Sequence, residues 1–200
     1  MPDFSIEDSY PGPIAGVDEA GRGPWAGPVV AAAVVLARGD VPAGLDDSKK
    51  LSAKRRAALF DKIMEQAWVG VGIGSVEEID RINIARANDL AMERAVRALD
   101  VAPVFLLIDG RWVPPALCGQ AEAVVKGDAR SLSIAAASII AKVTRDRIMA
   151  DLDRECPGYG WSRNQGYGTA EHTAALERLG VTPHHRRSFR PVHNMLYQEN

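Results

Sequence analysis

The segment VDEAGRGP, residues 17–24, contains the residue types in this chain that are best suited to chemistry. Asp18 and Glu19 are adjacent carboxylates at the end of an apolar stretch, and Gly21-Arg22-Gly23 follows within two residues. Carboxylate oxygens are the ligands that Mg²⁺ and Mn²⁺ prefer. Glycine lets the main chain approach a ligand closely, and arginine adds one fixed positive charge. The combination predicts metal-assisted chemistry on a phosphate ester.

Two more carboxylates follow short apolar segments, which are candidate strands. Asp109 follows the run 104–108, and Asp128 follows the run 121–125. Because ligands collect at strand ends along one edge of an α/β sheet, we expect both to lie with Asp18 and Glu19. Four carboxylates so close together repel one another, which raises the pKa of at least one of them unless a cation lies among them. Two ions about 4 Å apart would activate water and stabilise the leaving oxygen in phosphodiester cleavage.

Each acid also has a purely structural interpretation. Asp109-Gly110 alone is more typical of a turn, and Asp128 alone is typical of a helix N-terminus, where it complements the dipole. Taken singly, each position favours structure over chemistry. The adjacent pair Asp18-Glu19 is harder to explain in this way, because it ends an apolar strand and precedes the Gly-Arg-Gly triplet.

The elements that must position these residues alternate between strands and helices. Helices are expected to begin at Ser52, at the Ser75/Glu78 capping box, at Ser131 and at Thr169. Apolar runs predict strands at 14–17, 28–36, 69–75, 104–108 and 121–125, the first two as an antiparallel pair. This order predicts an α/β fold with a five-stranded mixed sheet flanked by helices and a helical C-terminal extension.

The 200 residues suffice for a single domain, with a core at about 13–155 and the extension at about 156–200. The composition is ordinary for a globular protein, with 46% hydrophobic and 25% charged residues. No apolar run is long enough to span a membrane, and the N-terminus lacks the basic start and apolar core of a secretory signal. Cys118 and Cys156 are far apart and not in a metal spacing, which favours free thiols and a cytoplasmic location.

Positive charges are clustered at 126–147 and beyond residue 180, although the net charge is −2. On charge alone a solvated surface is favoured, but a local basic face is compatible with phosphate contacts. The candidates for such contacts, ranked below the acids, are Lys49, Lys50, Lys126, Lys142, Arg145 and Arg186.

Motifs along nearly the whole chain, in order, resemble those of the bacterial type 2 ribonuclease H family, ribonuclease HII. DEAGRGP at 18–24, followed by AGPV at 26–29, resembles the family signature. The other matching segments are DSKKLS at 47–52, IDG at 108–110, KGD at 126–128, SIAAASI at 133–139, AKVTRD at 141–146, GYGT at 166–169 with His172, and His185-Arg186 with Ser188-Phe189.

The resemblance implies an RNase H-like fold and an endoribonuclease that hydrolyses the RNA strand of RNA–DNA hybrids. It also implies cleavage 5′ to single ribonucleotides embedded in duplex DNA, leaving 3′-hydroxyl and 5′-phosphate ends. The implied catalytic and metal-binding residues are Asp18, Glu19, Asp109 and Asp128, with two Mg²⁺ or Mn²⁺ ions as cofactors. The partners are then the hybrid and the ribonucleotide-containing duplex, and the protein is expected to be a monomer.

The resemblance also assigns substrate contacts. The triplet Gly21, Arg22 and Gly23 would read the ribose 2′-hydroxyl, and Tyr167 would pack on the sugar beside the RNA–DNA junction. The 2′-hydroxyl is the group that marks RNA, and main chain without a Cβ can reach it. The alternatives are a turn that uses glycine only for positive φ, and a core aromatic. Further expected contacts are Lys50, Lys142 and Arg145.

Two residues depart from the family pattern, and two other functions compete with the leading one. Trp25 stands where leucine is common, and Gln165 where lysine is common. His172, at the third position of the last expected helix, favours a structural role.

Two other functions are considered. The first is another nuclease or recombinase of the same fold, but a DNA-only enzyme does not need residues that recognise a 2′-hydroxyl. The second is a hybrid-binding protein without catalysis, but such a protein does not need four intact acids.

Overall fold

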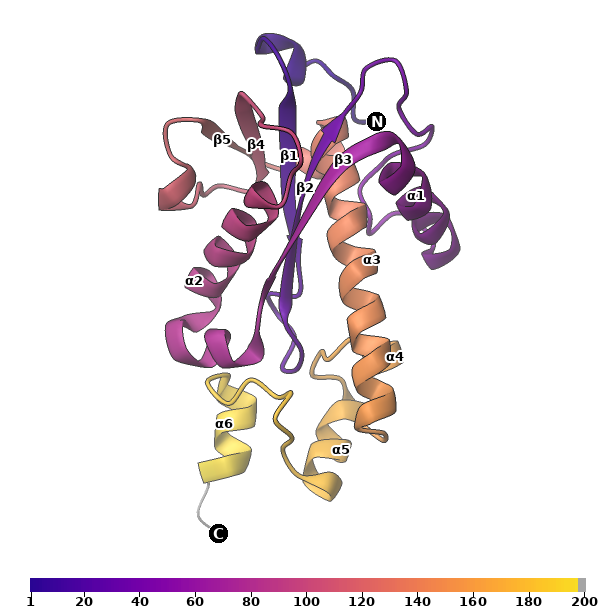
Figure 1. Ribbon diagram of the computed structural model, residues 1–200. Helices are drawn as coiled ribbons and strands as arrows, with labels where there is room; N and C mark the ends of the chain where they lie inside the picture. Colours follow the sequence, from indigo (N-terminus) through magenta and orange to yellow (C-terminus); the bar gives the residue numbers. More distant parts are fainter. Residues whose placement is uncertain (198–200) are drawn as a thin grey trace.

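Five strands form one mixed sheet at the centre of the computed structural model, which describes residues 1–197 (Figure 1). Residues 198–200 of the expected C-terminal extension lie outside the described residues. The strand order is β3-β2-β1-β4-β5, which places β1 in the middle. The strands are β1 (Ile14–Ala20), β2 (Val29–Leu36), β3 (Ala67–Gly74), β4 (Phe105–Asp109) and β5 (Ala121–Val124).

The strand pairing confirms the predicted five-stranded mixed sheet. β1 pairs antiparallel with β2, as expected, and parallel with β4. β2 and β3 are antiparallel, whereas β4 and β5 are parallel. Because Val17 is opposite Ile108 in the parallel register, the next residues of the two strands, Asp18 and Asp109, are neighbours across the sheet.

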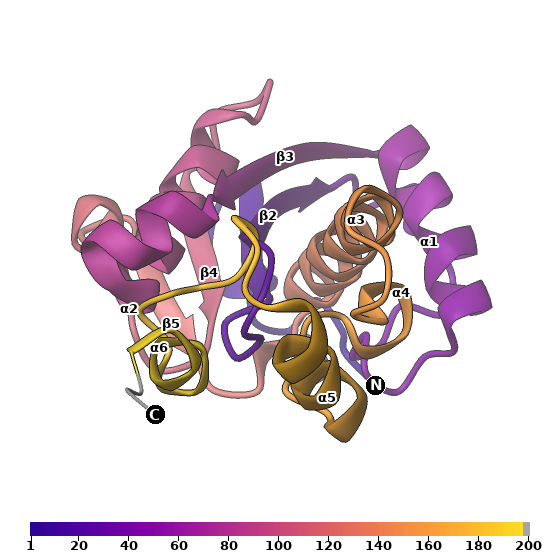
Figure 2. The same cartoon turned by 90° about the horizontal axis from the view of Figure 1, so that it is seen from below.

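Helices cover both faces of the sheet. Figures 1 and 2 show α2 on one face, α1 and α3 on the other, and α5 and α6 beyond one end of the sheet. No helix within residues 1–197 is long and apolar enough to cross a membrane. The helices are α1 (Ala53–Gln66), α2 (Val76–Arg97), α3 (Leu132–Glu155), α4 (Trp161–Asn164), α5 (Ala170–Leu179) and α6 (Arg190–Tyr197).

The four expected helix starts are confirmed. At each one, a serine or threonine oxygen accepts a hydrogen bond from the backbone N–H three residues later, which satisfies a donor the helix itself leaves free. The Ser75/Glu78 pair forms a complete capping box. The four capping residues are Ser52, Ser75, Ser131 and Thr169.

Two local features differ from the sequence-based expectation. The first strand was expected to end at Val17, but it continues to Ala20, because Asp18 and Glu19 remain in register with β2. Inside α2, Asn83 has φ 66° and interrupts the helix. Its side chain accepts hydrogen bonds from the N–H groups of Ala85 and Arg86, so it caps the second half of the helix.

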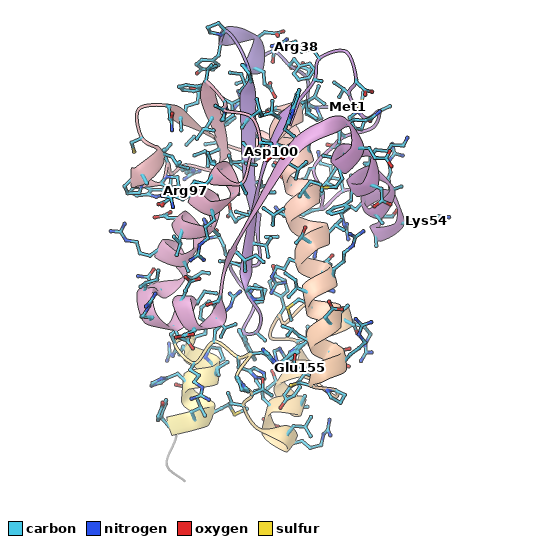
Figure 3. All side chains as sticks on the ribbon, in the orientation of Figure 1. Met1, Arg38, Lys54, Arg97, Asp100 and Glu155 are labelled. Atoms are coloured by element: carbon cyan, nitrogen blue, oxygen red, sulfur yellow. The ribbon has the colours of Figure 1, made fainter. Side chains whose placement is uncertain are left out.

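An apolar core lies on each face of the sheet. The α2 side contains residues such as Ile79 and Ala91, and the α3 side contains residues such as Ile139 and Ile140. Long charged side chains remain outside, and Figure 3 shows Lys54 extending away from α1. The small residues of α3 pack closely on the sheet, as their alanine content predicts. A Cβ added to Gly16 of β1 would lie 2.1 Å from the carbonyl carbon of Ser133.

We therefore expect Gly16→Ala to lower the free energy of unfolding by about 3 kcal/mol or more, because backbone of α3 must move. The matched control is Gly39→Ala, since no atom lies within 4 Å of a Cβ at Gly39. The control should stay within about 0.5 kcal/mol of the unmodified protein. Urea unfolding measures both variants. Equal stability of the two would contradict the close contact between β1 and α3.

Candidate active site

Four acidic side chains from three segments meet at the middle of the sheet. Asp18 and Glu19 lie on β1, and Asp109 ends the neighbouring strand β4. An oxygen of Asp109, Oδ1, accepts a hydrogen bond from the N–H of Gly127 at 2.7 Å. This bond holds the 3-10 turn η3 (Gly127–Ala129), which carries Asp128, against the end of β4. The structure thus brings together the four acids that the sequence predicts.

The negative charges of these acids repel one another, and two of the four side chains are buried. Asp18 is 6% exposed and Asp128 is 7% exposed. Burial, followed by the charges of Glu19 and Asp109, raises the pKa of Asp18 well above its usual value. Burial also raises the pKa of Asp128, and the charges of Asp109 and Asp47 add to the effect. A cation among the acids would offset this repulsion.

The donors fit a hard divalent cation. All four candidate ligands offer carboxylate oxygen, which suits Mg²⁺ or Mn²⁺ better than zinc. Within the described part of the chain, the one group of three His, Cys, Asp or Glu residues whose ligand atoms lie within 4.8 Å of one another is elsewhere, at Glu155, Cys156 and His184. The four acids are therefore more widely spaced than that group.

The cluster of Glu155, Cys156 and His184 does not require a metal ion to account for its geometry. His184 Nε2 lies 3.1 Å from Glu155 Oε1, so these two side chains already pair with each other. Burial, and then the charge of Glu155, raises the pKa of the Cys156 thiol, which disfavours the thiolate that metals bind. Cys118 and Cys156 are both free cysteines, as the sequence predicts.

The backbone conformation and a close contact require glycine at position 21 of the triplet, and Gly23 lies beside an aromatic ring. Gly21 has φ +97°, and a Cβ there would lie 2.0 Å from Nε of Arg145. A Cβ on Gly23 would lie 3.4 Å from Cε1 of Tyr167, so the triplet and this ring are neighbours. Tyr167 is 48% exposed, which argues against its being a core aromatic. The turn and the contact interpretations of the triplet are compatible.

The side chain of Arg22 extends over the acids. Its Nη1 lies 3.3 Å from Glu19 Oε1, and the Arg22 side chain is 54% exposed. Burial raises the pKa of Glu19, and the charge of Arg22 opposes that rise. A group with this exposure is free to turn toward a phosphate, and that role of Arg22 stays a prediction.

A cleft of about 400 Å³ is lined by Asp18 and Glu19, by the triplet and by Tyr167. The same cleft is lined by Lys49, Lys142 and two buried serines, Ser48 and Ser138, whose hydroxyl oxygens are 2.7 Å apart. A second cleft, of about 490 Å³, lies on the α2 side and shares Glu19 and Arg22 with the first. Residues that the sequence did not indicate, Asn88, Asp89 and Trp112, line this second cleft.

Lys49, rather than Lys50, faces the acids. Although partial burial lowers it, the charges of Asp128 and Asp18 raise the pKa of Lys49 overall. Lys50 instead places its Nζ 3.3 Å from Asp46 on the exposed surface. Because the two lysines are adjacent in a loop, the sequence does not indicate which of them faces the acids. Lys126, another candidate, is exposed and starts η3 with φ 55°.

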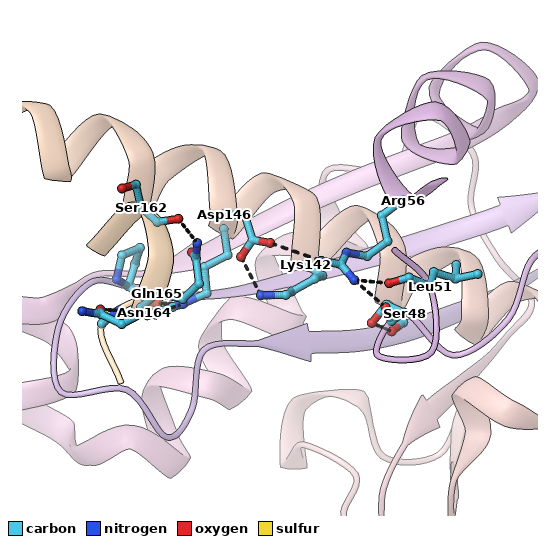
Figure 4. Close-up of polar contacts among 12 residues, drawn as sticks. Ser48, Leu51, Arg56, Lys142, Asp146, Ser162, Asn164 and Gln165 are labelled. Carbon is cyan, nitrogen blue, oxygen red and sulfur yellow. Dashed lines mark hydrogen bonds and ion pairs between the residues drawn. The ribbon is translucent and has the colours of Figure 1, made fainter. Parts of the chain in front are cut away.

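Figure 4 shows the polar contacts that hold the loop bearing Lys49. Arg56 of α1 donates hydrogen bonds to the carbonyls of Ser48 and Leu51, at 2.9 and 2.6 Å. Asp146 lies 2.6 Å from Nζ of Lys142 and 4.0 Å from Arg56. In the same view, Gln165 donates to the carbonyl of Ser162 at 2.9 Å, so Gln165 ties its own loop together.

Arg145 and Arg186 are buried residues that donate to main-chain carbonyls, which argues against the expectation that they contact phosphates. They are 1% and 0% exposed. Arg145 donates to the carbonyls of Pro28, Ala26 and Gln165, each at 3.0 Å. Burial lowers the pKa of Arg145 to about 10 and that of Arg186 to about 9. The sequence could not reveal this, because the carbonyl partners are distant along the chain.

His172 is fully buried and has the structural role that the sequence favours. Its Nε2 accepts a hydrogen bond from Nε1 of Trp161 at 3.1 Å, and its Nδ1 lies 3.0 Å from the carbonyl oxygen of Tyr167. Trp25 packs on the main chain of Gly168, where a Cβ would lie 2.0 Å from the indole ring. The departure at Trp25 therefore fills space beneath the loop that carries Tyr167.

Comparisons with known proteins identify the family of the chain. A family model described as Ribonuclease HII matches residues 15–192. A protein of Ruegeria pomeroyi named Ribonuclease HII is 61% identical, over 100% of this chain and 87% of that protein. The crystal structure of the ribonuclease H2 from Pyrococcus horikoshii OT3 has a TM-score of 0.78 at 27% identity, covering 92% of this chain and 97% of that one.

A more distant structure shows the fold alone. The crystal structure of Bst-RNase HIII in complex with Mn²⁺ has a TM-score of 0.75 at 21% identity, over 92% of this chain and 69% of that one. The matches confirm the predicted RNase H-like fold and the family resemblance of the motifs. The chain belongs to the ribonuclease HII family, and its activity is that of a ribonuclease H, a hydrolase of the RNA strand in RNA–DNA hybrids.

Proposed function

We propose that Asp18, Glu19, Asp109 and Asp128 bind two divalent metal ions, Mg²⁺ or Mn²⁺, and that the enzyme also cuts 5′ to single ribonucleotides in duplex DNA. The products are a 3′-hydroxyl and a 5′-phosphate. When bound, the ions supply an activated water and stabilise the leaving oxygen. The four carboxylates hold the ions and keep the site negative enough to attract them.

One observation carries this proposal: Asp18 and Glu19 line the same cleft as the Gly21–Gly23 turn, and Asp109 is the neighbour of Asp18 across the sheet. The scissile phosphate and the 2′-hydroxyl of the ribonucleotide belong to one nucleotide, so the group that reads and the groups that cut must be close neighbours. Only three residues separate Asp18 from Arg22 in the chain. The short connection fixes the distance between recognition and cleavage.

Tyr167 supplies the next contact along the strand. Its ring is half exposed and adjoins Gly23, so a sugar that follows the ribonucleotide can lie on it. A flat ring selects the shape of the sugar and carries no base preference. Lys49 and Lys142 line the same cleft and are placed to attract the phosphates of the backbone. Lys50 contributes only long-range charge, since it pairs with Asp46.

The wider setting is part of the same proposal. We take the chain as one domain, with a core at about 13–155 and the C-terminal extension after it, acting as a monomer. The contacts of Arg145, His172 and Arg186 with the core and the Tyr167 loop support treating the extension as part of that domain. Two free cysteines fit the reducing cytoplasm.

Removal of one carboxylate should separate binding from cleavage. Asp109→Asn should lower kcat/KM on a duplex with one ribonucleotide by about three orders of magnitude or more, because metal ligation supplies several kcal/mol of transition-state stabilisation. Binding of the duplex should be largely kept. The control is Asp100→Asn at an exposed position. Gel-based cleavage assays with and without chelator measure both.

Two outcomes of that assay would reject the proposal. Equal cleavage of an all-DNA duplex would indicate a general nuclease of the same fold. Undiminished activity in excess chelator would exclude the divalent ions.

Asp18→Asn should stabilise the metal-free protein at pH 7, by on the order of 1 kcal/mol. The folded-state pKa of Asp18 is raised, so its stabilising contribution is present below the unfolded pKa and lost as pH rises through the folded pKa. The neutral amide removes that loss. Thermal unfolding in chelator between about pH 5 and pH 8 tests this, with Asp100→Asn as the control. Destabilisation by Asp18→Asn at pH 7 would show that the carboxylates do not repel.

Tyr167→Ala should raise KM for the single-ribonucleotide duplex about fivefold or more, since stacking contributes roughly 1 kcal/mol. Tyr167→Phe should behave like the unmodified enzyme, because the ring and not the hydroxyl makes the contact. Steady-state kinetics on the same duplex compares the two. An equal loss in Tyr167→Phe would mean that the hydroxyl carries the interaction.

A further inference from the structure

A single buried side chain holds the main chain of the ribose-reading turn from behind. Arg186 donates through Nη2 to the carbonyl of Gly21 at 2.5 Å and through Nη1 to that of Arg22 at 2.9 Å. Its Nε donates to the carbonyl of Gly27 at 2.9 Å. Arg186 therefore binds two of the three residues of the triplet, through their peptide groups and not through their side chains.

The direction of these carbonyls determines where the amides point. In a trans peptide, the C=O of one residue and the N–H of the next point in opposite directions. With the carbonyls of Gly21 and Arg22 turned toward Arg186, the N–H groups of Arg22 and Gly23 point away from it. No hydrogen-bond acceptor for these two N–H groups is found among residues 1–197. The triplet lines the cleft, whereas Arg186 does not.

The position of Arg186 is itself fixed by main-chain pairing. The N–H of Arg186 donates to the carbonyl of Trp25 at 2.8 Å, and the N–H of Gly27 donates to the carbonyl of His184 at 2.9 Å. These bonds form a short antiparallel bridge at Ala26. The bridge sets the guanidinium against the turn after β1.

The next turn of the chain is anchored to α2. Asp80 accepts hydrogen bonds from the N–H groups of Arg187 and Ser188, at 3.0 and 2.9 Å, and from the hydroxyl of Ser188 at 2.6 Å. The guanidinium carbon of Arg186 lies 5.1 Å from the centre of the Phe189 ring. Segments on both sides of Arg186 are therefore held in place.

Charge neutralisation does not explain this buried arginine. Arg186 is 0% exposed, and none of the ion pairs formed by residues 1–197 includes it. Its neighbour Arg145 is also a buried cation, which is unfavourable. The planar guanidinium does, however, offer several N–H donors in fixed directions, and lysine cannot reproduce that fork. Arg186 therefore serves as a hydrogen-bond donor to three main-chain carbonyls.

We propose that Arg186 is a positioning residue for ribonucleotide recognition: it orients two peptide groups so that the N–H groups of Arg22 and Gly23 donate to the ribose 2′-hydroxyl oxygen. The inference rests on the proposed function of the triplet. It assigns to the C-terminal extension a direct part in substrate selection, since Arg186 lies about 160 residues after the turn that it holds.

The test is the affinity ratio between a duplex with one ribonucleotide and an all-DNA duplex of the same sequence. Both affinities are measured with Mn²⁺ present and in the Asp109→Asn background, because that substitution prevents cleavage. Arg186→Lys should lower this ratio by about fivefold or more, because it loses the oriented hydrogen bonds. The affinity for all-DNA duplex should change less than about twofold, because Arg186 is too buried to contact a phosphate.

Two variants separate positioning from general stability. Arg187→Lys makes the same substitution at the adjacent exposed residue and should leave the ratio unchanged. Arg94→Lys removes a guanidinium that donates to the carbonyl of Ile73 and to Glu78, away from the triplet and its cleft, so it should lower the melting temperature and keep the ratio. An unchanged ratio in Arg186→Lys, or an equal fall in Arg94→Lys, would overturn the proposal.

If Arg186→Lys does not fold, a milder variant tests whether Arg186 positions the triplet. Asp80→Ala removes the acceptor that anchors the turn after Arg186 and should lower the ratio in the same direction by a smaller factor. A ratio unchanged in Asp80→Ala would then count against the proposal. If the Asp109→Asn background itself shows no preference for the ribonucleotide, the proposed function fails and not only this inference.

Discussion

The parallel pairing of β1 with β4 places Asp18 beside Asp109, and this juxtaposition determines the electrostatics of the site. Two carboxylates side by side on a buried sheet repel each other, and Asp128 adds to the repulsion. The sheet can carry this repulsion because β1 is its central strand, paired on both edges and packed at Gly16 directly on α3. The strain is local, whereas the support comes from both apolar cores.

The residues proposed for recognition and those proposed for cleavage are neighbours because they share a short piece of chain. β1 carries two of the acids and leads directly into the Gly21–Gly23 turn. The other side of the cleft comes from distant segments: α3 supplies Lys142, and the loop after α4 supplies Tyr167. Buried arginines and histidine join these segments through main-chain carbonyls, so the shape of the cleft depends on the C-terminal extension as much as on the sheet.

Local signals made much of this predictable from sequence. The helix starts were marked by capping residues, and the acids were marked by their place after apolar runs. Burial was not predictable, because the carbonyl partners of Arg145 lie about 20 to 119 positions away. Nor could the sequence tell Lys49 from Lys50, or show that Asn83 interrupts α2, since each outcome depends on tertiary packing.

In the proposed mechanism, carboxylate-bound metal ions would activate water for attack, and the 2′-hydroxyl would be recognised without reacting. Identification of the product ends from a duplex with one ribonucleotide tests this claim most directly. Attack by a metal-activated water predicts a single cut 5′ to the ribonucleotide, with a 3′-hydroxyl on one fragment and a 5′-phosphate on the other. A 2′,3′-cyclic phosphate would contradict it, because that product requires the 2′-hydroxyl itself to be the nucleophile.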